Sequence, residues 1–261
     1  MVFRRWLKYI KYNLFSRHRR GHGIHSPFVF DLVSRVFRNK IDPDVVLMIE
    51  RLRKKLICDK RTIKVLDLGS GSVIKSDLRK ISDIVKYSSV PPQYGILLAN
   101  LASEFGKQGI IEFGTCLGIS TMYLAAGCRD SVIYTMEGCP EISSVAAANF
   151  SAAGFDNIKL MTGPFDELLP EIKRKATGPG IVFIDGNHRK EPVLKYFSEM
   201  ADISDKNTVI VLDDIHISDE MEEAWEEIKG DGNVSFTIDL YRMGLVFFRK
   251  GMSHIDYVIR Y

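Results

Sequence analysis

The 261-residue chain contains no long hydrophobic run. A helix that crosses a bilayer needs about 20 consecutive apolar residues, whereas the longest uncharged stretch, residues 87–103, is interrupted by Pro91, Pro92 and Asn100. Charges also interrupt every apolar run near the N-terminus, so the segment of about 7–15 apolar residues that marks a secretory signal peptide is missing. These two absences predict a cytoplasmic protein.

Cysteine is scarce: four residues form neither a C-x-x-C pair nor the cysteine–histidine spacing of a zinc site. In a chain without an export signal, scattered cysteines predict reduced thiols rather than a disulfide framework. Cys116 has no neighbouring His or Lys to activate it, so we do not expect it to be a nucleophile. The remaining composition, 46% apolar and 26% charged, is that of a globular protein and excludes a disordered or collagen-like chain.

Positive charge is concentrated at the N-terminus. Residues 1–40 hold ten Lys or Arg side chains and one acid, Asp31, whereas the remaining 221 residues hold 26 basic and 32 acidic side chains. Within this basic segment, residues 3–14 can form an amphipathic helix. We interpret the segment as a cap on its own domain or on the second subunit of a homodimer. Binding to an anionic membrane surface or to nucleic acid is the alternative.

From residue 110 onward, short β-branched runs alternate with helix-length segments. Strands are expected at 109–113, 132–136, 158–161, 181–184 and 208–212, and helices at 120–127, 141–153, 165–176 and 192–203. This alternation predicts a parallel sheet with helices on both faces. Two further strands, 235–240 and 244–249, are separated by Tyr241-Arg-Met243 and predict an antiparallel hairpin at one edge.

The predicted fold class is therefore α/β, with a Rossmann-like, doubly wound and mostly parallel sheet of seven strands. Residues 1–86 are expected to form a basic, mainly helical N-terminal cap, because they lack the alternation and are broken by Pro27 and Pro43. Residues 87–261 are expected to form the main domain.

A glycine loop, Glu112-Phe-Gly-Thr-Cys-Leu-Gly-Ile-Ser120, follows the first predicted strand. Gly114 permits a tight turn, and Gly118 lets the next helix approach closely, with its N-terminal N–H groups available to an anion such as a carboxylate. The spacing is neither the dinucleotide fingerprint G-x-G-x-x-G nor the phosphate loop. Glu112 would repel a phosphate but suits a cationic amine.

The next two strands lead into an acid and an aromatic residue. Glu137 ends the second strand, where an acid can accept both hydroxyls of a ribose, and a purine ring can rest on Phe165 after the third strand. A ligand with a carboxylate, an amine, a ribose and a purine but no pyrophosphate is S-adenosylmethionine. The candidate cofactor-binding residues are Glu112, Gly114, Thr115, Gly118, Ser120, Glu137, Gly138, Gly163, Phe165 and Asp185.

Four motifs in order resemble those of class I S-adenosylmethionine-dependent O-methyltransferases: residues 112–120, Met136-Glu137, Phe183-Ile-Asp-Gly186 and Val211-Leu-Asp-Asp214. The resemblance is to the branch that contains catechol and caffeoyl-CoA O-methyltransferases, and it covers roughly residues 87–250. It implies methyl transfer from S-adenosylmethionine to a hydroxyl of a small molecule. A related domain that has lost its ligand is the alternative.

A second glycine cluster, Gly69-Ser-Gly71, resembles a methyltransferase motif when taken alone. No strand that ends in an acid follows it about 20 residues later, as the ribose-binding arrangement would require. We therefore interpret this cluster as a turn of the N-terminal region and not as part of the site.

Acidic residues follow the fourth and fifth predicted strands, at Asp185, Asp213 and Asp214. The carboxyl ends of parallel strands meet at one edge of a sheet, and three carboxylates there would repel one another unless a cation or protons compensate. Oxygen ligands suit Mg²⁺, Ca²⁺ or Mn²⁺, and the resemblance implies that Asp185 and Asp213 are metal ligands, with Asp214 at a position that is usually Asn. The alternative is that Asp185 orients the cofactor amine and the aspartate pair caps the next helix.

His188 lies where catechol-type relatives carry a catalytic Lys. An imidazole is a competent base near neutral pH, so His188 and Asp185 are the candidate catalytic pair, with His216 as the alternative base. A loop histidine that hydrogen-bonds Asp185 is the other interpretation. His18, His22 and His25 are expected at the surface, and Trp225 in the core.

The sequence thus predicts an S-adenosylmethionine-dependent methyltransferase of a small-molecule hydroxyl, with assistance by a divalent metal such as Mg²⁺ left open. A nucleic-acid methyltransferase that uses the basic segment is an alternative, although Asp185-Gly-Asn-His188 stands where base-methylating enzymes usually carry Asn/Asp-Pro-Pro followed by an aromatic residue. A non-catalytic binding module is the third possibility. Nothing in the sequence identifies the methyl acceptor.

Overall fold

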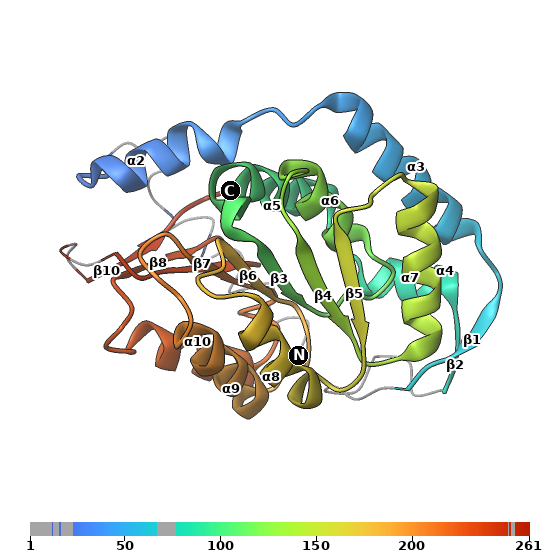
Figure 1. Cartoon of the computed structure of the whole chain (residues 1–261). Coiled ribbons are helices and arrows are strands. Elements are labelled where there is room, and N and C mark those ends of the chain that lie inside the picture. The colour runs from blue at the N-terminus through green and yellow to red at the C-terminus, as the bar shows by residue number, and fades with distance from the viewer. Residues whose placement is uncertain (1–11, 13–15, 17–22, 67–76, 250, 252–253) are drawn as a thin grey trace. The chain divides into compact units, whose positions relative to one another are not determined.

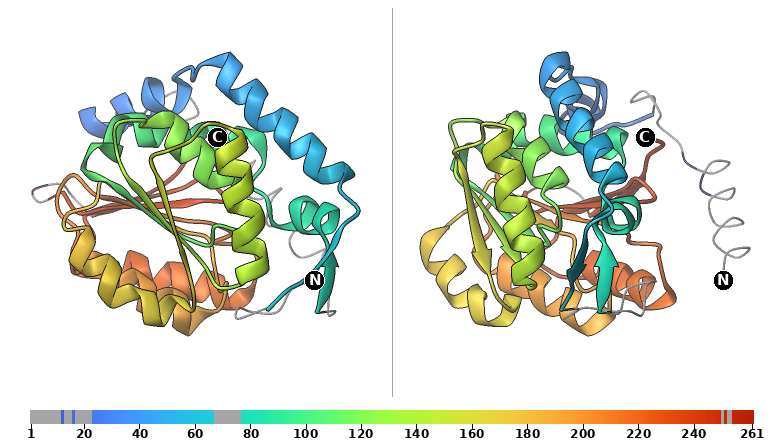
Figure 2. Two further views of the ribbon diagram at one scale, coloured as in Figure 1. Left: turned by 45° about the vertical axis from the view of Figure 1, so that its right-hand side comes forward. Right: turned by 90° about the vertical axis from the view of Figure 1, so that its right-hand side faces the viewer.

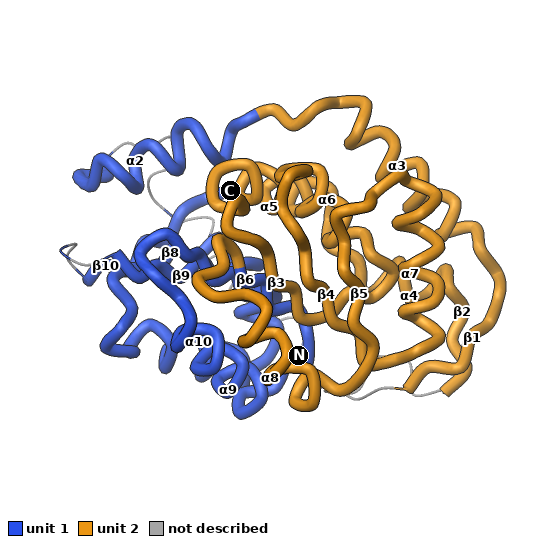
Figure 3. The backbone as a smooth tube through the Cα atoms, viewed as in Figure 1, with its two compact units in different colours: residues 1–39, 182–261 blue, residues 40–181 orange. Residues whose placement is uncertain are grey.

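The computed structural model describes residues 12, 16, 23–66, 77–249, 251 and 254–261 (Figure 1). The predicted helix at 3–14, except for Tyr12, and His18, His22 and the Gly69/Gly71 cluster lie outside the described residues. The chain divides into two compact units, which Figure 3 colours separately: unit 1 is Met1–Asn39 with Val182–Tyr261, and unit 2 is Lys40–Ile181.

Unit 2 contains three parallel strands that carry the glycine loop and the two loops after it. They are β3 (Ile110–Phe113), β4 (Ile133–Glu137) and β5 (Ile158–Thr162). Every residue of β3 is buried, as expected for a parallel strand that is covered on both faces. The helices of this unit are α3 (Pro43–Cys58), α4 (Ile81–Ser88), α5 (Pro92–Phe105), α6 (Ile119–Gly127), α7 (Pro140–Ala152) and α8 (Phe165–Lys175), with a 3₁₀ turn, η2 (Gly106–Gln108).

Helices α5 and α6 of unit 2 lie side by side (Figure 2). Their close approach requires small residues: a Cβ on Gly127 would lie 2.1 Å from the carbonyl oxygen of Ala99, and one on Gly95 would lie 2.4 Å from the ring of Tyr123. The hydroxyl of Tyr123 also donates to Glu50 Oε1 of α3 at 2.9 Å. The N-terminal helix α3 is therefore attached to α6, which begins at the glycine loop.

Unit 1 contains the remaining strands of the main sheet: β6 (Ile181–Ile184), β7 (Val209–Leu212), β8 (Phe236–Asp239), β9 (Gly244–Phe247) and β10 (Ile255–Val258). Strand β9 pairs antiparallel with both β7 and β8, and β10 pairs parallel with β8. The helices are α2 (Pro27–Ser34), α9 (Lys190–Ala201) and α10 (Asp219–Lys229), with a 3₁₀ turn, η1 (Val36–Arg38). Trp225 of α10 is buried as predicted, with its ring against Gly244.

The strand order of the main sheet is β10-β8-β9-β7-β6-β3-β4-β5. The predicted mostly parallel α/β sheet is confirmed, and its strands begin and end within two residues of the expected positions. The predicted number of seven strands was too low, because β10 adds an eighth strand beyond the hairpin among the described residues. No helix in the described part of the chain is long and apolar enough to span a bilayer.

The described N-terminal residues are helical, as expected, but they also contain a small antiparallel sheet of β1 (Thr62–Lys64) and β2 (Leu78–Lys80). Helix α2 belongs to unit 1, whereas α3 and α4 belong to unit 2. A separate N-terminal cap is therefore not confirmed, and the domain boundary between residues 86 and 87 stays a prediction.

Candidate active site

The loop between β3 and α6 is shaped by its two glycines. Gly114 and Gly118 have φ angles of 100° and 84°, in the left-handed region that favours glycine. A Cβ on Gly118 would lie 2.3 Å from the ring of Phe150 in α7. The backbone N–H groups of Gly114 and Thr115 both donate to the carbonyl oxygen of Met136 at 3.0 Å, which ties the loop to the end of β4.

Glu137 lies at the end of β4 and joins two of the predicted loops. Its Oε2 accepts the N–H of Cys116 at 2.8 Å, and its Oε1 accepts the N–H of Cys139 at 3.0 Å. These bonds fix the orientation of a half-buried carboxylate. An ionised carboxylate has about four lone-pair sites, so it can accept more than two hydrogen bonds. Gly138 lies in the same turn.

Glu112 of β3 is fully buried. Its Oε2 accepts the hydroxyls of Thr121 at 2.5 Å and Thr135 at 2.7 Å, whereas its Oε1 has no hydrogen-bond partner among the described residues. Burial raises the pKa of Glu112 to about 7, against the opposing effect of hydrogen bonds from Ser120, Thr121 and Thr135. A buried, unpaired carboxylate oxygen suits a proton or a cationic group. The expected contact with an amine stays a prediction.

The loop after β5 is hydrogen-bonded to the same region. Gly163 donates its N–H to the carbonyl oxygen of Glu137 at 2.9 Å. Phe165, at the start of α8, makes an edge contact with Phe113 of β3, with ring centroids 5.6 Å apart, and its ring remains partly exposed. Unit 2 therefore connects the loops after β3, β4 and β5, and these loops with the elements that flank them contain every predicted cofactor-binding residue except Asp185.

In unit 1, the aspartates after β7 are paired with an arginine that was not predicted. Arg242 makes a bidentate ion pair with the fully buried Asp213, with Nε 2.9 Å from Oδ1 and Nη2 2.6 Å from Oδ2. The same Nη2 lies 3.5 Å from Asp214 Oδ1. Burial and the charge of Asp214 raise the pKa of Asp213, while Arg242 and His188 oppose that effect. Burial disfavours the charged guanidinium, but Asp213, Asp214 and Asp185 raise the pKa of Arg242, so it remains a cation.

The predicted metal ligands do not fit a divalent cation. Both carboxylate oxygens of Asp213 already accept guanidinium donors, so a metal would have to displace Arg242. Over the residues that the structure describes, no group of three or more His, Cys, Asp or Glu side chains is arranged to hold a metal. Arg242 was not predicted, because the sequence shows only that it lies in the short connection between β8 and β9.

The predicted catalytic pair lies after β6. His188 Nε2 is 3.5 Å from Asp185 Oδ1, and the two side chains are partly exposed. Between them, Asn187 adopts a φ of 53° and accepts the Nε–H of Arg189 at 2.9 Å, which turns the chain sharply at this point. This geometry is compatible both with a base oriented by Asp185 and with a simple loop contact.

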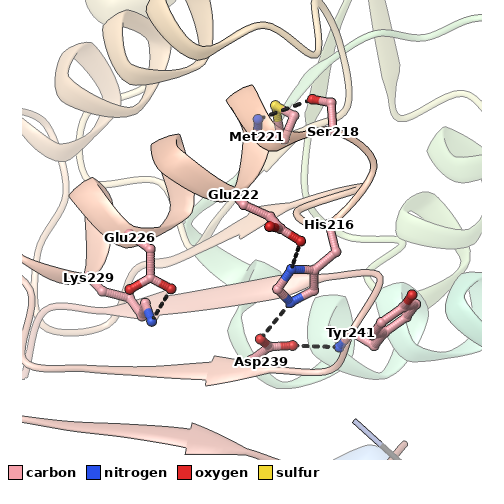
Figure 4. Close-up of polar contacts among 8 residues, drawn as sticks. All are labelled: His216, Ser218, Met221, Glu222, Glu226, Lys229, Asp239 and Tyr241. Atoms are coloured by element: carbon pink, nitrogen blue, oxygen red, sulfur yellow. Dashed lines mark hydrogen bonds and ion pairs between the residues drawn. The ribbon is translucent and has the colours of Figure 1, made fainter. Parts of the chain in front are cut away.

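His216, the alternative base, has both ring nitrogens facing carboxylates (Figure 4). Nε2 lies 2.8 Å from Asp239 Oδ2, and Nδ1 lies 3.2 Å from Glu222 Oε1. Burial disfavours the charged ring, but both carboxylates favour it, and the net result is a raised pKa of His216. A ring held between two acids is protonated more readily and is less suited to accept a substrate proton. His216 is therefore less suited to act as the base, and the role of His188 stays a prediction.

Comparisons with known proteins support a common family. Residues 111–215 match the family model described as "Methyltransferase domain". The chain is 32% identical over 130 residues to catechol O-methyltransferases of Niastella koreensis and Mycobacterium tuberculosis. Each alignment covers 49% of this chain, and they cover 58% and 57% of those two proteins, which is less than two thirds of their length. The solved O-methyltransferase of Bacillus cereus in complex with S-adenosylhomocysteine aligns with a TM-score of 0.57 at 20% identity, over 84% of this chain and 97% of that chain. Residues 111–215 therefore match a methyltransferase domain, and about half of the chain is similar to O-methyltransferases, in agreement with the resemblance that the sequence motifs showed.

Proposed function

We propose that the protein transfers the methyl group of S-adenosylmethionine to a hydroxyl oxygen of a small molecule. The observation that carries this proposal is the carboxylate of Glu137, held by the N–H groups of Cys116 and Cys139 at the end of β4. A fixed carboxylate in this position accepts the two hydroxyls of a ribose. The similarity to catechol O-methyltransferases supports a small-molecule acceptor.

Other residues of unit 2 are proposed to hold the rest of the cofactor. Gly118 caps α6 without a side-chain oxygen, so the first N–H groups of the helix are available to the carboxylate of the methionine part. The unpaired Oε1 of Glu112 suits its ammonium group. Phe165, with its partly exposed ring, is proposed to pack against the adenine.

The acceptor must lose its proton for efficient attack on the methyl carbon. We assign His188 as the base, oriented by Asp185. The imidazole takes the hydroxyl proton, an oxygen lone pair forms the new bond to carbon, and the carbon–sulfur bond breaks with its electron pair going to sulfur. The products are the methyl ether, S-adenosylhomocysteine and a protonated histidine that returns its proton to solvent. No step is assigned to a metal. The nucleic-acid alternative depends on the basic segment, most of which lies outside the described residues, so it stays a sequence-based alternative.

Calorimetry with purified protein tests the proposal. Glu137→Gln is expected to weaken binding of S-adenosylmethionine by about tenfold, or about 1.4 kcal/mol, because an amide offers one acceptor oxygen where the carboxylate offers two. Glu171→Gln is the matched control, since Glu171 is exposed on α8 and pairs only with Lys175 among the ion pairs of the described residues. A folded wild-type protein that binds no S-adenosylmethionine would exclude the proposed function.

A further inference from the structure

We infer that the guanidinium of Arg242 occupies the position of a divalent cation beside Asp213 and Asp214, so that this site works without a metal. The inference rests on the proposed function only for its catalytic consequence, because the ion pair itself belongs to unit 1. The Nη2 atom of Arg242 lies 2.6 Å from Asp213 Oδ2 and 3.5 Å from Asp214 Oδ1. One cation therefore serves both aspartates after β7.

The geometry excludes a shared arrangement in which metal and arginine bind together. In a bidentate pair the two N–H groups of the guanidinium fork point at both oxygens of one carboxylate. Asp213 is 0% exposed, so it has no open side from which a hydrated ion can approach, and its distances to Arg242 are 2.9 and 2.6 Å. A divalent ion would bind at Asp213 only after the guanidinium had left.

The turn that carries Arg242 is held in place by several backbone bonds. Ile215, in the loop after β7, donates its N–H to the carbonyl oxygen of Arg242 at 3.1 Å. Within the turn, the N–H of Arg242 bonds the carbonyl of Leu240, and the N–H of Leu240 bonds the carbonyl of Met243, both at 2.9 Å. Tyr241 has a φ of 69°, an uncommon conformation for a residue with a side chain. Such a conformation persists only where surrounding contacts enforce it.

His216 supplies one of these contacts, as Figure 4 shows. Its Nε2 pairs with Asp239 Oδ2, and the other oxygen of Asp239 accepts the N–H of Tyr241 at 2.6 Å. The rings of His216 and Tyr241 also lie against each other, with centroids 5.4 Å apart, and Glu222 holds the second nitrogen of the histidine. His216 is therefore a positioning residue that keeps the turn, and with it Arg242, against Asp213.

Binding of Mn²⁺, measured by electron paramagnetic resonance, tests the inference on the full-length protein without any assay of methyl transfer. The wild-type protein is expected to leave Mn²⁺ free at a metal concentration of about 1 mM, the weak end of the range for protein sites that bind Ca²⁺. Arg242→Met is expected to gain Mn²⁺ binding, because Asp213 and Asp214 then lack their cation. The double variant Arg242→Met/Asp213→Asn is expected to lose the binding again.

Two results would overturn the inference. The first is that the wild-type protein binds Mn²⁺ and that Asp213→Asn abolishes this binding, which would show that metal and arginine share the site. This comparison does not depend on the stability of the Arg242→Met variant. The second is an Arg242→Met variant that is folded by circular dichroism but takes up no Mn²⁺. That result would show that the two aspartates after β7 do not form a cation site. Calorimetry of S-adenosylmethionine with and without EDTA keeps the proposed function separate: absence of cofactor binding excludes that function but leaves the Mn²⁺ results intact.

Discussion

Replacing Arg242 with methionine also tests how much the ion pair after β7 contributes to stability. The substitution keeps an unbranched side chain but leaves the fully buried carboxylate of Asp213 without its two charged donors. Removing one partner of a buried ion pair costs about 3–5 kcal/mol, because the remaining charge is desolvated and unpaired. Since the side chain of Arg242 is itself 26% exposed, we expect a loss toward the lower end of this range at pH 8.

Arg35→Met is the matched control for this variant. Arg35 makes a bidentate pair with Asp31 in the same unit, with distances of 3.0 and 2.8 Å, but the two side chains are 55% and 52% exposed. Solvent screens an exposed ion pair, so the control is expected to lose much less stability than Arg242→Met. Urea denaturation followed by circular dichroism and tryptophan fluorescence measures the free energy of unfolding of both variants.

The loss in Arg242→Met is expected to depend on pH. Burial raises the pKa of Asp213, and removal of Arg242 takes away the largest opposing effect. The folded variant then binds a proton at a pH where the unfolded chain, with an aspartate pKa of about 3.9, does not, so its stability increases as pH falls through the folded pKa. The difference from wild type should be smaller at pH 5 than at pH 8, and Asp213→Asn should restore part of it. An equal loss of less than about 1 kcal/mol at both pH values would refute the reasoning.

Three further predictions concern the glycine loop and the two histidines. Gly118→Ala is expected to lose stability through left-handed backbone strain of about 1–2 kcal/mol and through overpacking against Phe150 of about 1–3 kcal/mol. Gly154→Ala is the control, because Gly154 has a φ of 70° and no atom within 4 Å of its Cβ, so urea denaturation should show the strain alone. Equal losses of unfolding free energy in the two variants would contradict the close approach of Gly118 to Phe150. His216→Gln should lose more stability at pH 6 than at pH 9, because the pKa of His216 is raised in the folded protein. The ion pairs of the charged ring contribute fully below the unfolded pKa of about 6.5 and no longer contribute once pH exceeds the folded pKa. A loss of stability that is independent of pH would argue against a charged ring. His188→Gln should lower kcat by about 10²–10⁴-fold in a methyl-transfer assay, while the affinity for S-adenosylmethionine, measured by calorimetry, stays unchanged. An unaltered kcat would exclude His188 as the base.

The strands that carry the site were predictable because their signals are local. A short β-branched run followed by a glycine or an acid is a property of neighbouring residues, and β3 to β9 were recovered on that basis. Strand β10 was missed because Ile255, Asp256 and Val258 are all exposed, so it lacks the alternation that marks a half-buried strand. Strands β1 and β2 are only three residues long and carry no period that a sequence reveals.

The sequence by itself determined the order of strands and helices and the polar residues that follow each strand, since both depend on short-range patterns. Only the tertiary structure decided which charges meet. Arg242 reaches Asp213 across 29 residues, and His216 reaches Asp239 across 23, through the pairing of β9 with β7 and β8. That register results from many individually weak contacts summed over the hairpin, which no local pattern encodes, and it replaces a predicted metal site with an ion pair.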